Sequence, residues 1–324
     1  MILFLWIAIF IASLAVLVKS ADWLLDSAEK IGLAAGLSPF IIGVTIVGLG
    51  TSFPELITAV IAVLKGASEI VSATAIGSNV SNILLILGIS AIVAGRLSVT
   101  KNIIDLDLPL LAVGTVLFLG VIWDRQVVFF ESILLLIAYI IYLLYTVIHR
   151  DDEEGETLPS RETRRRKKIK TPLKPKLVTK DFILLFVGIA GLIVGAKYMI
   201  DAMLELSVIL NIGAGVIAIT AAALGTSLPE LVVSLKAALN KKSEIAIGNI
   251  FGSNIFNMFV VVGIPGLIST IKLDGPTFAV GAPAVALVTL LFVISGISRR
   301  IHAWEGAIYL LVYILFIAKI LNLF

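Results

Sequence analysis

The chain has 324 residues, of which 59% are hydrophobic and only 15% are charged, and its formal net charge is +3. Soluble domains carry about 25% charged residues, so this composition excludes an ordinary water-exposed protein. The chain has no cysteine, which excludes disulfides and thiolate metal sites, and its two histidines lie in different loops. Most of the excess positive charge lies in one loop, so we expect it to report membrane orientation, with no nucleic-acid partner.

Ten apolar segments follow one another along the chain, and each has about the 20 residues needed to cross the hydrocarbon core of a bilayer. We therefore predict a polytopic membrane protein embedded in the lipid bilayer by ten transmembrane helices. No positive charge precedes the first segment, which predicts a retained helix and not a secretory signal. The segments cover residues 2–25, 39–64, 70–94, 103–122, 127–148, 181–205, 214–239, 245–270, 276–297 and 303–323.

One long polar segment, residues 150–180, separates the fifth and sixth predicted helices and contains the basic run 164–168. Basic loops remain on the cytoplasmic side of a membrane, so we expect this linker inside and both termini outside the plasma membrane. The short loops agree, with seven lysines and arginines on the predicted inner side and three on the outer side. The domains predicted are a first five-helix repeat at 1–149, the linker, and a second, inverted five-helix repeat at 181–324.

The two halves match each other without a gap when residues 26–88 are shifted by 175 positions. Residues 49–56 fall on 224–231, and the Gly-Ser-Asn sequence at 77–79 falls on 252–254. Because each half has five predicted helices, the second copy enters the membrane from the opposite side. Inverted repeats of this kind are typical of transporters that alternate access to a site in the middle of the membrane.

Glu55 and Glu230 occupy equivalent positions within apolar segments of the two halves. A carboxylate near the bilayer centre costs about 2.5 kcal/mol or more, so each must face a partner or a water-filled cavity. One interpretation is a protonated glutamate that is hydrogen-bonded between helices. Two such glutamates at equivalent positions favour a functional cation site instead.

A proline precedes each glutamate and predicts a break in its helix. Pro54 has no amide hydrogen to donate to the carbonyl of Gly50, and Pro229 has the same relation to Gly225. Free carbonyls are not tolerated against lipid, so we expect them to line a cavity within the protein. A simple kink that neighbouring hydroxyls relieve is the alternative. The predicted fold is all-α, with helices two, three, seven and eight broken.

The following helix of each half adds a polar pair, Ser78 with Asn82 and Ser253 with Asn257. A spacing of four residues places each pair on one helix face, one turn apart. These side chains can hydrogen-bond between helices or bind an ion, and their recurrence in register favours an ion site.

The candidate ligands are two carboxylates, hydroxyls, amide oxygens and freed carbonyls. This set suits a hard cation such as Ca²⁺, which takes six to eight oxygens, with Mg²⁺ as second choice. An empty site holds two like charges and should rarely change orientation, whereas one Ca²⁺ or several Na⁺ ions compensate them. That rule predicts an antiporter, which is not an enzyme and needs no cofactor. Because one chain contains both repeats, we expect a functional monomer.

At these residues the sequence resembles the calcium/cation antiporter superfamily, specifically its prokaryotic-type sodium/calcium exchangers. The Gly-Thr-Ser-x-Pro-Glu motifs at 50–55 and 225–230 are similar to the paired repeats of that family, as are the two Gly-Ser-Asn motifs. The resemblance implies exchange of Ca²⁺ for Na⁺ by alternating access, in which the first and sixth helices slide against the remaining bundle.

The resemblance also implies a cluster of cation sites in which Glu55 and Glu230 are shared by Ca²⁺ and Na⁺. Backbone oxygens of Thr51 and Thr226 would complete the Ca²⁺ site, and Asn82 and Asn257 would hold the centre. The flanking Na⁺ sites would use Ser52, Ser227, Ser78, Ser253 and the carbonyls near Gly48 and Ala223.

Asn257 departs from the aspartate of potassium-dependent relatives, which argues against K⁺ co-transport. The calcium/proton branch typically has Gly-Asn-Ala-x-Glu, so the motifs here fit the sodium branch better, although a Ca²⁺/H⁺ antiporter remains the alternative. An intramembrane hydrolase that uses the paired acids would need a nucleophile and base that the motifs lack. A passive cation channel is the third alternative.

Overall fold

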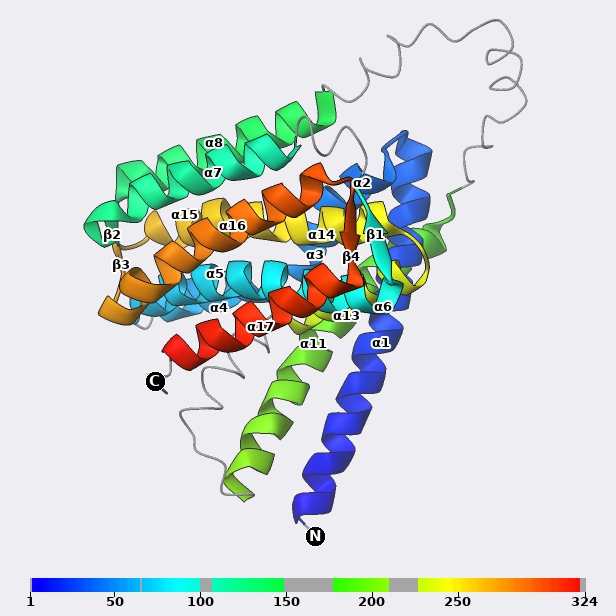
Figure 1. Cartoon of the computed structure of the whole chain (residues 1–324). Helices are drawn as coiled ribbons and strands as arrows, with labels where there is room; N and C mark the ends of the chain where they lie inside the picture. Colours follow the sequence, from blue (N-terminus) through cyan, green and yellow to red (C-terminus); the bar gives the residue numbers. More distant parts are fainter. Residues whose placement is uncertain (1, 65, 100–106, 149–176, 210–226, 321–324) are drawn as a thin grey trace, which may run out of the picture.

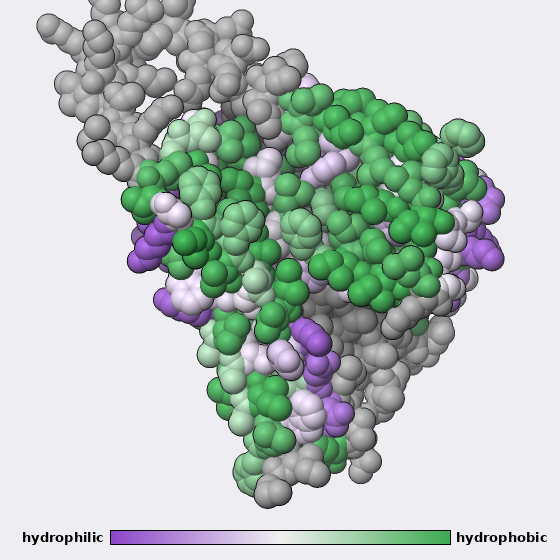
Figure 2. Space-filling view, turned by 180° about the vertical axis from the view of Figure 1, so that it is seen from behind, coloured by the Kyte–Doolittle hydropathy of each residue, from purple (hydrophilic) through white to green (hydrophobic). Residues whose placement is uncertain are grey.

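The computed structural model describes residues 2–64, 66–99, 107–148, 177–209 and 227–320, and these are mostly helical (Figure 1). Six described helices are long and apolar enough to cross a membrane, or seven if one bent pair counts as a single span. Large apolar side chains cover much of the outer surface (Figure 2), as lipid-facing helices require. The chain is therefore an integral membrane protein.

Two long helices, α1 (Ile2–Ala35) and α11 (Thr179–Ile209), run side by side along one edge of the molecule (Figure 1). Glycines of α11 make this close approach possible. A Cβ atom at Gly188 would lie 2.9 Å from the backbone nitrogen of Leu24, and one at Gly195 would lie 3.0 Å from Leu17 Cγ. Small residues allow helices in a membrane to approach closely, and here they join α1 to α11.

The motif proline is the second residue of a helix in each half. In the first half, α2 (Pro39–Ile42), the π-helix η1 (Gly43–Val47) and α3 (Gly48–Thr51) lead to α4 (Phe53–Leu64), and the axis bends by 41° between α3 and α4. In the second half, the equivalent helix is α13 (Leu228–Leu239), whose first and last residues match those of α4 in the register of the repeat.

The remaining helices also follow in similar order in the two halves. The first half has α5 (Glu69–Ser81), η2 (Asn82–Leu87), α6 (Gly88–Ala94), α7 (Leu108–Val121), η4 (Ile122–Asp124) and α8 (Phe129–Ile148). The second half has α14 (Ser243–Phe256), η5 (Asn257–Val261), α15 (Val262–Gly266), η6 (Thr277–Gly281), α16 (Ala282–Ile297) and α17 (Ala303–Ile320).

Two short antiparallel strand pairs join loops at opposite ends of the helices (Figure 1). β1 (Arg96–Ser98) pairs with β4 (Arg300–His302), and β2 (Gln126–Val127) pairs with β3 (Ile271–Lys272). The sequence predicts helices alone, so these strands are a small correction to the all-α prediction. They form where loops between apolar helices meet and their backbone groups find partners in each other.

The core of the molecule is the α14–η5–α15 span, which is buried at every residue from 245 to 263. Glycines let the segment formed by α2, η1 and α3 pack directly on this span. A Cβ atom at Gly43 would lie 2.6 Å from the carbonyl oxygen of Ile245, and one at Gly248 would lie 2.5 Å from that of Phe40. Backbone meets backbone at this crossing, which fixes α2 and η1 beside α14.

Candidate functional site

The two motif glutamates are fully buried in the first turns of two equivalent helices, Glu55 in α4 and Glu230 in α13. The N-terminal end of a helix carries partial positive charge, so this position favours a carboxylate. The serines that precede the two helices have nearly the same backbone conformation, with φ −88° and ψ 5° at Ser52 and φ −87° and ψ 7° at Ser227. Residues of active sites often have such dihedral angles.

Serines of the two halves meet across the centre of the molecule. The Ser52 hydroxyl lies 2.8 Å from Glu230 Oε1 and 2.9 Å from Ser253 Oγ. The Ser227 hydroxyl lies 3.3 Å from Ser78 Oγ. In the alignment of the two halves, Ser52 is equivalent to Ser227 and Ser78 to Ser253, so the two serine contacts are equivalent. Five predicted site residues, all of them buried, therefore form one cluster to which both halves contribute.

The predicted asparagines, Asn82 and Asn257, are fully buried, and each begins a π-helical segment. Their side-chain amides have no hydrogen-bond partner among the described residues, and neither has Glu230 Oε2. A buried polar group without a partner costs about 1–3 kcal/mol, so these oxygens are suited to a ligand. π-Helical turns within α-helices occur frequently at functional sites.

Other predicted residues are placed less completely. Thr226 and Ala223 lie outside the described residues. The Gly48 carbonyl accepts hydrogen bonds from the Ser52 amide at 3.1 Å and the Thr51 hydroxyl at 3.3 Å. Its oxygen is thus held by its own chain, and a cation there would share it with these donors.

Sequence reasoning missed Asn249, a fully buried residue of α14 whose Oδ1 lies 3.1 Å from the Thr51 hydroxyl. The repeat gives no specific signal for this residue, because its equivalent in the first half is Thr74 and the halves differ at every aligned position of 71–76 and 246–251.

The lysine that follows Glu230 in the same helix is paired elsewhere. Lys236, six residues after Glu230, forms an ion pair with Asp22 of α1. The described residues contain no group of three or more His, Cys, Asp or Glu side chains that could hold a metal ion. Two carboxylates, supplemented by neutral hydroxyl, amide and carbonyl oxygens, are the candidate ligands, and this donor set suits hard cations.

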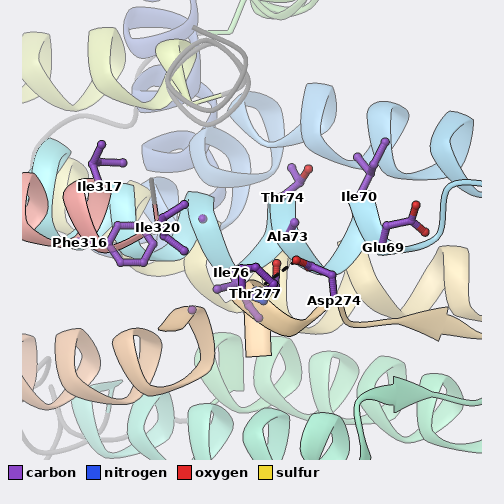
Figure 3. Close-up of a pocket in the computed structure, with 13 residues that line it drawn as sticks. Glu69, Ile70, Ala73, Thr74, Ile76, Asp274, Thr277, Phe316, Ile317 and Ile320 are labelled. Carbon is purple, nitrogen blue, oxygen red and sulfur yellow. Dashed lines mark hydrogen bonds between the residues drawn. The ribbon is translucent and has the colours of Figure 1, made fainter. Parts of the chain in front are cut away.

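A separate pocket of about 450 Å³ opens near the start of α5 (Figure 3). Glu69 and Thr74 of α5 and Asp274 and Thr277 of the second half supply its polar groups, and the Thr277 amide donates to Asp274 Oδ2 at 3.5 Å. Most of the lining is apolar, and none of the predicted site residues contributes to it. The pocket is therefore lined by residues other than those of the predicted site.

Comparisons with known proteins agree on one family. The model of the family described as "Sodium/calcium exchanger protein" matches residues 5–148 and 180–321. The chain is 32% identical over 318 residues to the uncharacterized membrane protein MJ0091 of Methanocaldococcus jannaschii, covering 98% of this chain and 99% of the relative. It is 31% identical over 343 residues to sodium/calcium exchanger MaX1 of Methanosarcina acetivorans, covering 95% and 96%.

The fold is similar to that of a solved structure of the sodium-calcium exchanger NCX_Mj, soaked with Na⁺ and Sr²⁺. The TM-score is 0.80 and the sequence identity is 30%, with 98% of this chain and 99% of that chain covered. Both the sequence and the arrangement of helices thus match over nearly the whole length.

Proposed function

The chain belongs to the sodium/calcium exchanger protein family, and on this premise we propose that it exchanges Ca²⁺ for Na⁺ across the plasma membrane. The family resemblance that the paired motifs indicate is confirmed. Members of this family are transporters rather than enzymes. The coupling of the two ions in this chain is the part that we infer.

The observation that carries the proposal is the contact between Ser52 of the first half and Glu230 of the second, at 2.8 Å. It supports a single site that both halves build, with one carboxylate from each. Two negative charges balance one Ca²⁺ or two Na⁺ ions, so the two kinds of cation would occupy the site in alternation. Each compensates charges that are costly to leave alone in a buried site.

We infer that the site consists of the motif residues of both halves. Glu55 and Glu230 would bind both cations, with backbone oxygens of Thr51 and Thr226 completing the Ca²⁺ site. The remaining ligands would be Ser52, Ser227, Ser78, Ser253, Asn82, Asn257 and the carbonyls near Gly48 and Ala223. The buried amides of Asn82 and Asn257, which lack protein partners among the described residues, support this assignment.

We further infer ten transmembrane helices in two inverted repeats, residues 1–149 and 181–324, with helices two, three, seven and eight broken. The matching bounds of α4 and α13 support the repeat. So do the strand pairs, because the register of the repeat relates β1 to β3 and β2 to β4. Such repeats would alternate access to a site between them.

The strand pairs also support the inferred topology. With the linker inside, the predicted topology places both loops joined by β1–β4 on the cytoplasmic side and both loops joined by β2–β3 outside. The linker 150–180 would then lie in the cytoplasm and both termini outside. Because both repeats lie in one chain, a monomer would suffice for transport.

The test is radiolabelled Ca²⁺ uptake into proteoliposomes that contain Na⁺ and are diluted into sodium-free buffer. A matched set carries a pH gradient in place of the Na⁺ gradient. We expect uptake that requires internal Na⁺. Uptake driven by the pH gradient alone would contradict Na⁺ coupling and assign the chain to the Ca²⁺/H⁺ alternative on the same fold.

A further inference from the structure

Asn249 contacts the candidate site at a position where the two halves differ. The alignment that superimposes the motifs places Thr74 on Asn249 and Ala59 on Ser234. The halves differ at every aligned position of 71–76 and 246–251, between the shared Glu-Ile and Gly-Ser-Asn sequences. Among these differences, the one between Thr74 and Asn249 changes which hydrogen bonds each half can form.

Asn249 of α14 contacts α13 of the second half and the motif of the first half. Its Nδ2 donates to Ser234 Oγ at 2.8 Å and to the Glu230 carbonyl oxygen at 3.4 Å, while its Oδ1 lies 3.1 Å from the Thr51 hydroxyl. An amide side chain has two N–H donors and one carbonyl acceptor, and here each group has a partner. Asn249, Ser234 and Thr51 are fully buried, so water cannot replace these bonds easily.

The first half cannot form the same connection. Ala59 has no polar side-chain atom, and Thr74 has no amide with which to bridge two partners. Thr74 is half-buried and lines the pocket near Glu69 and Asp274 (Figure 3). An asparagine–serine bridge like the one beside Glu230 therefore cannot form beside Glu55.

We propose that Asn249 is a positioning residue that fixes the Glu230 turn to Thr51 and so holds the Glu230 half of the cation site in place. This inference rests on the proposed function, because it assigns a role within the same site. A ligand that is held in place before binding has less freedom to lose when a cation arrives. Groups that orient metal ligands typically change metal affinity by about 10- to 100-fold when they are removed.

The experiment replaces Asn249 with threonine, the residue at the equivalent position 74 of the first half. Asn249→Thr should raise the KM for Ca²⁺ about 10-fold or more with a smaller change in kcat, because ligand placement is lost while the ligands remain. Thr74→Val, at the equivalent position of the first half, should keep the wild-type KM. A kcat or melting temperature that falls while KM stays unchanged would mark a merely structural residue and overturn the proposal.

Ser234→Ala removes one partner of the bridge and provides a second variant if Asn249→Thr does not fold. We expect a smaller rise in KM for Ser234→Ala, and a double variant no worse than Asn249→Thr, because both changes act on one bridge. Full additivity, or a wild-type KM in Ser234→Ala, would contradict the bridge.

Calorimetric Ca²⁺ binding by the purified full chain in sodium-free buffer separates this inference from the proposed function. If wild type transports with Na⁺ and Asn249→Thr matches its KM, the inference falls and the proposed function stands. If wild type shows no Na⁺-driven uptake, the proposed function falls, and a weaker Ca²⁺ affinity of Asn249→Thr still supports the inference. Equal affinities would overturn it, and no Ca²⁺ binding by wild type would overturn both.

Discussion

The enclosed core around α14 and the peripheral pair of α1 and α11 are held to their neighbours by different interactions. At the core, backbone packs on backbone at Gly43 and Gly248, and buried hydrogen bonds cross between the halves. The α1 helix meets α13 and the following loop through ion pairs, Asp22 with Lys236 and Glu29 with Lys242, the latter at 2.5 Å.

This difference separates permanent contacts from exchangeable ones. Partly exposed ion pairs contribute little stability and re-form easily, whereas close backbone packing has no alternative arrangement of similar energy. The core is therefore suited to hold a site of fixed geometry, and the α1–α11 pair is suited to move beside it. Sliding of the first and sixth helices, which the family resemblance implies, is compatible with this distribution and stays a prediction.

The largest effect is expected at the core carboxylates. Glu55→Gln and Glu230→Gln should each lower Na⁺-driven Ca²⁺ uptake more than about 100-fold, because a unit charge close to a bound divalent cation contributes several kcal/mol. Uptake assays on reconstituted protein, at matched amounts of inserted protein, measure the loss. Glu69→Gln is the control, since Glu69 is an exposed glutamate in the first turn of the neighbouring helix α5. Robust exchange by either core variant would remove the basis of the site.

Two glycines test the difference between the core and the α1–α11 pair, because Gly252 faces backbone atoms and Gly191 faces a side chain. Gly252→Ala should lower the free energy of unfolding by about 1–3 kcal/mol, because its Cβ would collide with the carbonyl oxygen and Cα of Val44, which are fixed backbone atoms. Gly191→Ala in α11 should cost less, since its Cβ meets the Ser20 hydroxyl, which can rotate away. Thermal unfolding in detergent compares the two variants. A larger loss for Gly191→Ala would contradict the idea of a rigid core and an adaptable pair.

The smallest effect is expected at the ion pairs of α1. Lys236→Met or Lys242→Met should change the melting temperature little, because ion pairs of this exposure contribute about 0–1 kcal/mol. Any shift in the exchange rate should be correspondingly limited to about 5-fold. Exchange rates at saturating Ca²⁺, measured beside Asp22→Asn, check this prediction. A loss of folding in either lysine variant would mean that the pairs are structural anchors of the core.

Sequence could predict the residues of the cluster but not their pairing. The duplicated motif pointed to Ser52, Ser253, Ser227, Ser78 and Glu230, and the structure brings these five together. The contact between Ser52 and Glu230 of the other half depends on how the helices cross. Close packing at glycines determines that crossing. Thr226 and Ala223 stay predictions, because they lie outside the described residues.

Other features could not be predicted, for physical reasons that differ. Asn249 was missed because a repeat identifies what two halves share, and the role of this residue comes from what they do not share. The partner of Lys236 could not be predicted because Asp22 is 214 residues away in sequence. The strands are two or three residues long, too short for any periodicity to be recognised.

The central claim is that Na⁺ and Ca²⁺ occupy one site built from both halves. The most direct test is a calorimetric titration of the purified chain with Ca²⁺ at increasing fixed Na⁺ concentrations. Our account predicts that Na⁺ raises the apparent Kd for Ca²⁺ competitively, and that Glu55→Gln and Glu230→Gln each abolish Ca²⁺ binding. A Kd that is independent of Na⁺, or full Ca²⁺ binding by either variant, would contradict a shared site.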